Sequence, residues 1–155
     1  MGGTVYLETT IPSYLAGRPS RDLVIAAHQQ ITHEWWNRAK ERFNLYISEA
    51  VLEEIRAGDP AVAAKRLEFV AGLPALELRQ DVRDLVRLYS DRLNFPPQAQ
   101  ADVLHIAFAV SYGLDYLVTW NCKHIANGYF IRRLLRVNQE IRRPTPVILT
   151  PEELS

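Results

Sequence analysis

Four polar residues stand beside predicted strands and helices where their side chains could act together. They are Glu8, Glu54, Asp102 and Asn121. Glu8 directly follows the apolar run 5–7, and Asn121 directly follows the run 117–120. Glu54 and Asp102 lie in stretches of helical spacing, beside apolar positions that face a core. Because the carboxyl ends of parallel strands form one edge of a sheet, we expect the four side chains to converge there.

The chemistry of such a group is that of a divalent cation site. Three carboxylates brought together repel one another unless a cation neutralises them. Oxygen ligands without a Cys or His partner suit Mg²⁺ or Mn²⁺ better than Zn²⁺. Taken singly, each residue also has a structural interpretation: Glu8 could cap a helix, Glu54 could be a solvated helix carboxylate, and Asn121 could be a turn residue. Asp102 fits such a role least, because its apolar neighbours leave it poorly solvated unless a partner is present.

The elements that must position these residues alternate along the chain. Short β-branched and aromatic runs predict strands at 4–7, 44–48, 75–78, 115–120 and 146–149. Apolar residues at helical spacing predict helices at 24–39, 51–55, 61–71, 82–93, 97–112 and 128–141, with Gly113 as a helix stop. Strands separated by helices imply right-handed crossovers and a mostly parallel sheet covered on both faces. We therefore expect an α/β fold and one domain over residues 1–155.

Composition narrows the class of protein. The chain has 155 residues, 48% of them hydrophobic, which is enough for a core without disulfides or a structural metal. The longest charge-free apolar stretch, 103–114, is too short to cross a bilayer, and the N-terminal residues lack the features of a signal peptide. The single Cys122 cannot form an internal disulfide. We expect a soluble, cytoplasmic protein that does not associate with membranes.

Charge is balanced overall but uneven along the chain. The 18 Lys and Arg residues offset 18 Asp and Glu residues, which excludes a protein that binds nucleic acid by overall charge alone. Residues 123–143 nevertheless hold six basic residues and one acid, Glu140, for a formal sum of +5. The basic residues are Lys123, Arg132, Arg133, Arg136, Arg142 and Arg143. This stretch could follow an RNA backbone, although a solvated helix face explains the spacing of the arginines equally well.

At the polar residues the sequence resembles PIN-domain proteins of the VapC type, the toxins of bacterial and archaeal toxin–antitoxin pairs. Four segments carry the resemblance. They are YLETTIPSYL at 6–15, SEAVLEEI at 48–55, ADVLHIAFA at 101–109 and TWNCKHI at 119–125. The resemblance implies a five-stranded sheet in the order 3-2-1-4-5, flanked by helices. It also implies an acidic pocket that binds Mg²⁺ or Mn²⁺ and an endoribonuclease activity.

The family pattern assigns the individual acids. The first acid is usually Asp, and Glu8 occupies that position here. The second acid precedes an aliphatic residue, which selects Glu54 over Glu53, and Asp102 matches the third. Asn121 stands at the fourth acidic position. A longer Glu8 must place its oxygen at the same short distance from the ion, and the missing charge at Asn121 favours weaker metal binding or one ion instead of two.

The resemblance also implies a mechanism and partners. Glu8, Glu54 and Asp102 would hold the metal, Asn121 would orient a water, and the ion would activate that water to hydrolyse an RNA phosphodiester. Thr9 is an accessory candidate for binding water or phosphate, and His124 for contacting phosphate or protonating the leaving oxygen. The family's toxins form homodimers and are silenced by a cognate antitoxin. The departures at positions 8 and 121 support an alternative, a weakly catalytic or non-catalytic PIN-like module that binds RNA or a partner protein.

Overall fold

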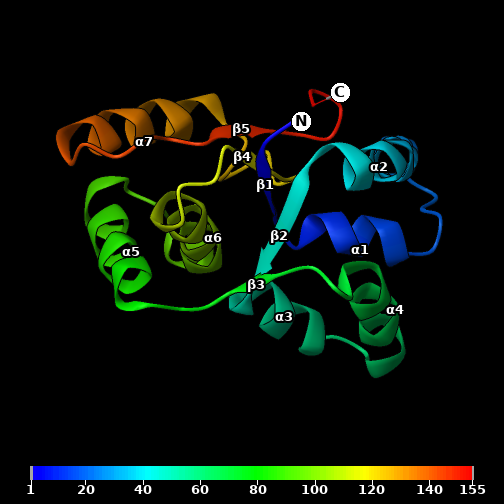
Figure 1. Ribbon diagram of the computed structural model, residues 1–155. Helices are drawn as coiled ribbons and strands as arrows, with labels where there is room; N and C mark the ends of the chain where they lie inside the picture. Colours follow the sequence, from blue (N-terminus) through cyan, green and yellow to red (C-terminus); the bar gives the residue numbers. More distant parts are fainter. Residues whose placement is uncertain (1, 155) are drawn as a thin grey trace.

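A central parallel sheet organises the computed structural model, which describes residues 2–154 (Figure 1). The strands stand in the order β3-β2-β1-β4-β5, and every neighbouring pair is parallel. They are β1 (Thr4–Leu7), β2 (Asn44–Ser48), β3 (Ala75–Leu76), β4 (Tyr116–Val118) and β5 (Val147–Leu149). The predicted α/β class and the order 3-2-1-4-5 are confirmed.

Helices cover both faces of this sheet. They are α1 (Thr10–Ala16), α2 (Leu23–Arg42), α3 (Glu49–Arg56), α4 (Pro60–Val70), α5 (Gln80–Arg92), α6 (Gln100–Ser111) and α7 (Gly128–Glu140), with a 3₁₀ turn at Pro97–Ala99. In Figure 1, α5 and α6 lie to the left of β1 and β2, while α1, α2 and α4 lie to the right. No helix among residues 2–154 is long and apolar enough to cross a membrane.

Burial on both faces explains the composition of the central strand. Val5, Tyr6 and Leu7 are all fully buried. An inner parallel strand therefore reads as a continuous apolar run, because helices exclude water from both of its sides. Glu8, the next residue, is the first polar side chain after this run, and its amide donates to the Val118 carbonyl at the end of β4. The end of β1 thus places an acid directly beside the end of β4.

Local signals set several of the helix boundaries. The side chain of Asp22 caps α2, that of Asp59 caps α4 and that of Asn127 caps α7, each accepting hydrogen bonds from two backbone amides of the first turn. Gly113, at φ 63°, follows the end of α6 and confirms the predicted stop.

Several elements differ from the sequence predictions. Strand β4 covers only Tyr116–Val118 of the predicted 115–120, and the predicted helix 97–112 divides into the 3₁₀ turn and α6. Helix α1 was not predicted, because it has only seven residues and contains Pro12. It forms because Pro is tolerated in a first helical turn and because Ile11 and Leu15 are buried against the core. Strand β3 ends at Leu76 instead of continuing to 78, since the amide of Leu78 donates to the Glu49 carboxylate and not to a neighbouring strand.

Candidate functional site

Glu8 is a buried carboxylate held by two hydroxyl groups. Its side chain follows β1 and is 5% exposed. Thr10 Oγ1 donates to Glu8 Oε1 at 2.6 Å, and Thr119 Oγ1 donates to the same oxygen at 2.6 Å. Both hydroxyls also accept a backbone amide, Thr10 from Trp120 and Thr119 from Asn121. The turn after β4 therefore fixes one oxygen of Glu8, and Oε2 accepts no hydrogen bond among the described residues.

Glu54 reaches the same place from α3. Thr9 Oγ1 donates to Glu54 Oε1 at 2.5 Å, and His105 Nε2 lies 2.6 Å from that oxygen. Helix α3 packs on α6, which carries His105. One ligand atom from each of Glu8, Glu54 and His105 lies within 4.8 Å of the others. Two predicted acids thus meet at the carboxyl end of the sheet.

Asp102 lies at the start of α6 and is held by the turn that follows β4. Asn121 Nδ2 donates to Asp102 Oδ1 at 2.8 Å, and His124 Nδ1 lies 3.0 Å from Asp102 Oδ2. Asn121 Oδ1 in turn accepts the amide of His124. Asp102 is not part of the 4.8 Å group. Asn121 and His124 are thus arranged around Asp102 and bind it directly.

Burial and hydrogen bonds shift the pKa values of Glu54, His105 and Asp102. Burial would raise the pKa of Glu54, but the hydrogen bonds from His105 and Thr9 and the nearby imidazole lower it overall. Burial would lower the pKa of His105, but the hydrogen bond to Glu54 and the charges of the surrounding acids raise it. Burial raises the pKa of Asp102 despite the hydrogen bond to His124. Glu54 is therefore a carboxylate at neutral pH.

The donor set fits a hard divalent cation. Among residues 2–154, the acids of this site form ion pairs only with histidines, and no Lys or Arg pairs with them. Glu8 has no ion-pair partner at all within that range, although it is buried. A buried carboxylate without a cation is costly, and a bound Mg²⁺ or Mn²⁺ would remove that cost. Oxygen-rich sites favour these ions.

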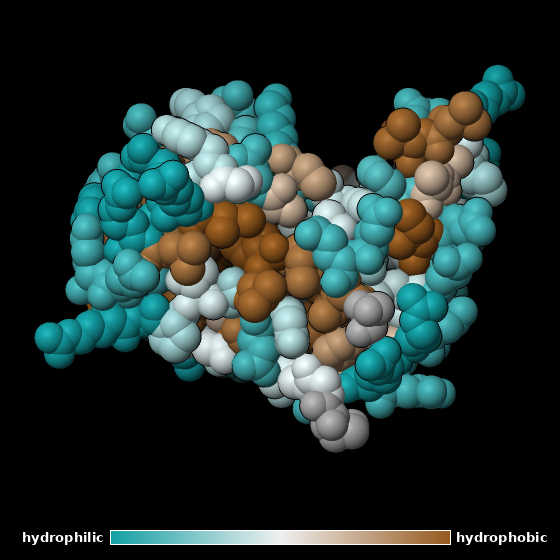
Figure 2. All heavy atoms as spheres, turned by 90° about the horizontal axis from the view of Figure 1, so that it is seen from above, coloured by the Kyte–Doolittle hydropathy of each residue, from teal (hydrophilic) through white to brown (hydrophobic). Residues whose placement is uncertain are grey.

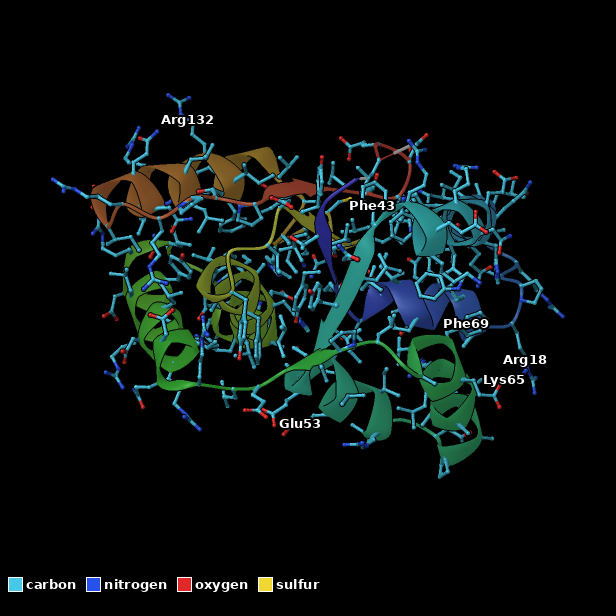
Figure 3. The ribbon with its side chains drawn as sticks, in the orientation of Figure 1. Arg18, Phe43, Glu53, Lys65, Phe69 and Arg132 are labelled. Carbon is cyan, nitrogen blue, oxygen red and sulfur yellow. The ribbon has the colours of Figure 1, made fainter. Side chains whose placement is uncertain are left out.

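The remaining predicted residues lie outside this group. Lys123, Arg132 and Arg136 are exposed, and Figure 3 shows Arg132 pointing away from α7. Arg133 is only partly exposed, and its guanidinium donates to the Arg92 carbonyl and the Tyr129 hydroxyl. Arg143, at the end of the basic stretch, pairs with Asp81 and lowers the pKa of that carboxyl to about 2. The basic stretch thus offers fewer free charges than its sequence indicates.

Glu53, the neighbour that the family pattern rejected, is exposed and points outward from α3 (Figure 3). Sequence reasoning missed His105 and the hydroxyls of Tyr6 and Thr119. The one available signal was a histidine among apolar residues, three positions after Asp102, inside a helix that should face the core.

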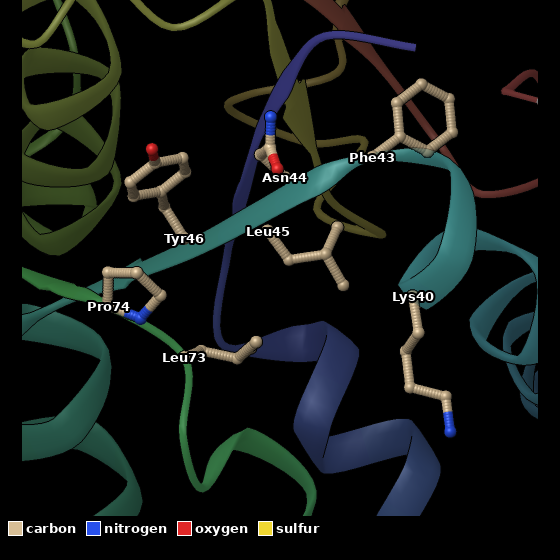
Figure 4. A pocket seen from close by; sticks show the side chains of 7 residues that line it. All are labelled: Lys40, Phe43, Asn44, Leu45, Tyr46, Leu73 and Pro74. Atoms are coloured by element: carbon tan, nitrogen blue, oxygen red, sulfur yellow. The ribbon is translucent and has the colours of Figure 1, made fainter. Parts of the chain in front are cut away.

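A separate hollow opens at the other end of the sheet. Figure 4 shows it beside the start of β2, a cavity of about 370 Å³. Its lining is Lys40, Phe43, Asn44, Leu45, Tyr46, Leu73 and Pro74. Figure 2, seen from above, shows a band of hydrophobic residues with hydrophilic margins on the face where β1 begins. No carboxylate lines this hollow, and the candidate site lies at the carboxyl ends of the strands.

Comparison with known proteins identifies the fold. No family model matches the sequence. No curated protein matches it. Solved structures match in three dimensions, among them the following two. A chain of VapBC2 from Rickettsia felis, solved bound to a DNA fragment of its promoter, is similar with a TM-score of 0.59 and 15% identity, covering 95% of this chain and 98% of that one. VapC20 of Mycobacterium tuberculosis, a toxin that cleaves the sarcin–ricin loop, is similar with a TM-score of 0.59 and 13% identity, covering 77% of this chain and 91% of that one. The chain has the PIN-like fold of VapC proteins.

Proposed function

We propose that this protein is a Mg²⁺- or Mn²⁺-dependent endoribonuclease and the toxin of a VapBC-like pair. The observation that carries the proposal is the convergence of Glu8 and Glu54, without a Lys or Arg partner among residues 2–154. Burial is the main cause that raises the pKa of Asp102, and Asp102 lies near enough for the charge of Glu54 to raise that pKa too. Its fold is shared with a toxin that cleaves the sarcin–ricin loop, which supports RNA as the substrate. We expect it to act in the cytoplasm.

In this proposal, one carboxylate oxygen of Glu8 and of Glu54 binds protein groups and the other binds the metal. Glu8 and Glu54 each use Oε1 to accept hydrogen bonds, so that Oε2 of each is free to bind a cation. When bound, the ion supplies positive charge for the scissile phosphate and increases the acidity of water. In hydrolysis, the water oxygen bonds to phosphorus, the bond to the leaving oxygen breaks, and a proton passes to that oxygen.

Asp102, Asn121 and His124 form the other side of the site. Asp102 contributes the third carboxylate, and its two oxygens are oriented by Asn121 and His124. His124 uses Nδ1 for Asp102, which leaves Nε2 for a phosphate oxygen or for protonating the leaving oxygen. Thr9 holds Glu54 directly. Its role in the proposal is therefore to orient a carboxylate, and it binds phosphate only if it releases Glu54.

Removal of metal tests the proposed function. Total RNA and a structured RNA are incubated with protein stripped by EDTA, and then with Mg²⁺ or Mn²⁺ added back. We expect no cleavage in EDTA and restored cleavage with either ion, because the acids alone supply no positive charge to the phosphate. Full activity in EDTA would contradict the proposal.

The exposed arginines of α7 should contribute to RNA affinity. They line a hollow of about 470 Å³ with Gly128, Tyr129 and Arg133. Replacing both Arg132 and Arg136 with Ala should weaken the salt dependence of RNA binding. The slope of the logarithm of the binding constant against the logarithm of the salt concentration should fall in magnitude by about 1.4, because each phosphate contact on a single strand contributes roughly 0.7. Filter binding at several salt concentrations measures the slope. Arg38→Ala combined with Arg56→Ala, two exposed arginines on α2 and α3, is the control. An equal change in the slope for the α7 double variant and the control double variant would contradict a role of the α7 arginines in RNA binding.

Partner proteins have a candidate surface on α2. Leu23 is 86% exposed and Val24 is 64% exposed, both in the first turn of that helix. Large exposed apolar side chains are commonly covered by another chain. In the proposal, this turn contributes to contacts with a second copy of the protein or with the cognate antitoxin.

A non-catalytic module that binds RNA or a protein is the second candidate. It is supported by Asn121, whose amide binds Asp102 at the position where the family has a fourth acid. Isothermal titration distinguishes the two, since a non-catalytic module has no need to bind Mn²⁺ at Glu8 and Glu54.

A further inference from the structure

A chain of hydrogen bonds runs through the core to Glu54. Tyr6 Oη lies 2.7 Å from Ser48 Oγ and 2.6 Å from His105 Nδ1. His105 Nε2 lies 2.6 Å from Glu54 Oε1. Tyr6 and Ser48 are fully buried, and His105 is 1% exposed. Three buried polar side chains therefore connect β1, the end of β2 and α6 to the carboxylate on α3.

The direction of the last bond follows from its chemistry. A carboxylate accepts hydrogen bonds, so Nε2–H of His105 donates to Glu54. Nδ1 faces the Tyr6 hydroxyl, which can donate to a neutral ring or accept from a charged one. Ser48 completes the chain in either case, because its hydroxyl can also reverse. Both ring nitrogens of His105 are thus occupied.

The chain closes on a single helix. Ser48 Oγ accepts the amide of Val51 and caps the N-terminus of α3, the helix that carries Glu54. One end of the chain therefore fixes the start of α3, and the other end fixes a carboxylate farther along the same helix. This arrangement determines both where the helix begins and where Glu54 Oε1 points.

His105 is poorly placed to bind a metal itself. To ligate an ion, it would have to release Glu54 or Tyr6, and its ring has almost no contact with solvent. An apolar side chain would fill the same space without needing partners for two nitrogens, as Phe108 does one turn later on α6. The two hydrogen bonds of the His105 ring are therefore best explained by the position that they give to Glu54.

We propose that His105, supported by Tyr6 and Ser48, is a positioning residue that holds Glu54 Oε1 and so presents Oε2 to a divalent cation. This role rests on the proposed function. In metal sites, outer groups that orient a ligand typically contribute tenfold to a hundredfold in metal affinity. His105 acts through Glu54 and does not touch the substrate.

The test measures Mn²⁺ affinity by isothermal titration in three variants. His105→Phe removes both nitrogens and should weaken Mn²⁺ binding on the order of tenfold to a hundredfold. His105→Gln can place an amide nitrogen near the position of Nε2 and should restore most of the affinity. Tyr6→Phe keeps the ring, loses the hydroxyl and should weaken binding by less than His105→Phe does.

Tyr89→Phe is the matched control. Tyr89 is also fully buried and donates to a buried partner, Asn138 Oδ1, at 2.5 Å. Both tyrosine variants lose one buried hydroxyl, which makes two hydrogen bonds in Tyr6 and one in Tyr89, so Tyr6→Phe should lose at least as much thermal stability as Tyr89→Phe. Only Tyr6→Phe should change Mn²⁺ affinity, and raising Mn²⁺ should return its rate of RNA cleavage toward that of the wild type.

The outcomes separate the two proposals. Wild-type protein that neither binds Mn²⁺ nor cleaves RNA would overturn the proposed function and the positioning role with it. Wild-type protein that binds Mn²⁺, together with unchanged affinity in the folded His105 and Tyr6 variants, would overturn the positioning role alone. If His105→Phe does not fold, the Mn²⁺ affinities of Tyr6→Phe and Tyr89→Phe decide: equal affinities would overturn the positioning role.

Discussion

Glu8→Gln should strongly reduce the rate of RNA cleavage while leaving the metal-free protein at least as stable as the wild type. Glutamine keeps an oxygen that can accept from Thr10 and Thr119, so the local hydrogen bonds persist. The substitution removes a buried charge that has no cationic partner among residues 2–154, which favours the metal-free fold. It also removes an anionic metal ligand. We expect a rate loss of at least about 100-fold, equivalent to roughly 3 kcal/mol in the barrier.

Glu53→Gln provides the control for this substitution. Glu53 is an exposed acid of α3, next in sequence to Glu54 but pointing away from the site (Figure 3). Its replacement should change neither the cleavage rate nor the stability measured by thermal unfolding. Equal activity of Glu8→Gln and the wild type, at matched protein and Mn²⁺ concentrations, would show that Glu8 is a structural residue.

Asp102→Asn should have an effect of similar size on cleavage. Asparagine can still accept from Asn121 through Oδ1, but it loses the negative charge and presents an amide toward His124. We expect a loss of at least about 100-fold in rate, because a charged ligand close to Glu54 becomes neutral. Because half-buried Asp102 has a raised pKa, the loss of its charge should not unfold the protein.

Asp115→Asn controls for the loss of an aspartate at the sheet. Asp115 precedes β4 at the opposite end from the site, where it accepts from the amide and the hydroxyl of Thr4. Its replacement should lower stability without lowering the cleavage rate of the folded protein. Comparable rate losses in Asp102→Asn and Asp115→Asn would indicate that Asp102 acts through stability, and the proposed metal role would be wrong.

The sheet and the position of its acids could be predicted because their signals are local. The run 5–7 is continuously apolar, as an inner parallel strand requires, and Glu8 interrupts it where the strand ends. The same alternation of strands and helices predicts that Glu8 and Glu54 approach each other, and their ligand atoms do so within 4.8 Å.

The contacts that orient the acids could not be predicted in the same way. Glu8 is held by Thr119, which is 111 residues away in the sequence, and Glu54 is held by His105, which is 51 residues away. Such pairs depend on the three-dimensional packing of α6 and of the turn after β4. Nothing local in the sequence distinguishes a histidine that donates to a carboxylate from one that fills the core.

Asn121 shows how the structure changes the interpretation of a departure from a family pattern. Its sequence position indicates a lost carboxylate and a residue that orients water. In the structure its amide donates to Asp102, and its carbonyl accepts the amide of His124. Asn121 therefore connects two other residues of the candidate site, a role that an aspartate could not fill because it cannot donate to Asp102 when ionised.

In the proposed function, Glu8 and Glu54 together hold a divalent cation. The most direct measurement is an anomalous difference map from crystals of the wild-type protein soaked in Mn²⁺. We expect a strong peak in contact with carboxylate oxygens of both Glu8 and Glu54, at the carboxyl end of β1, and no peak there in Glu8→Gln crystals. A wild-type map with Mn²⁺ peaks only elsewhere on the protein, or with none, would contradict the proposed function.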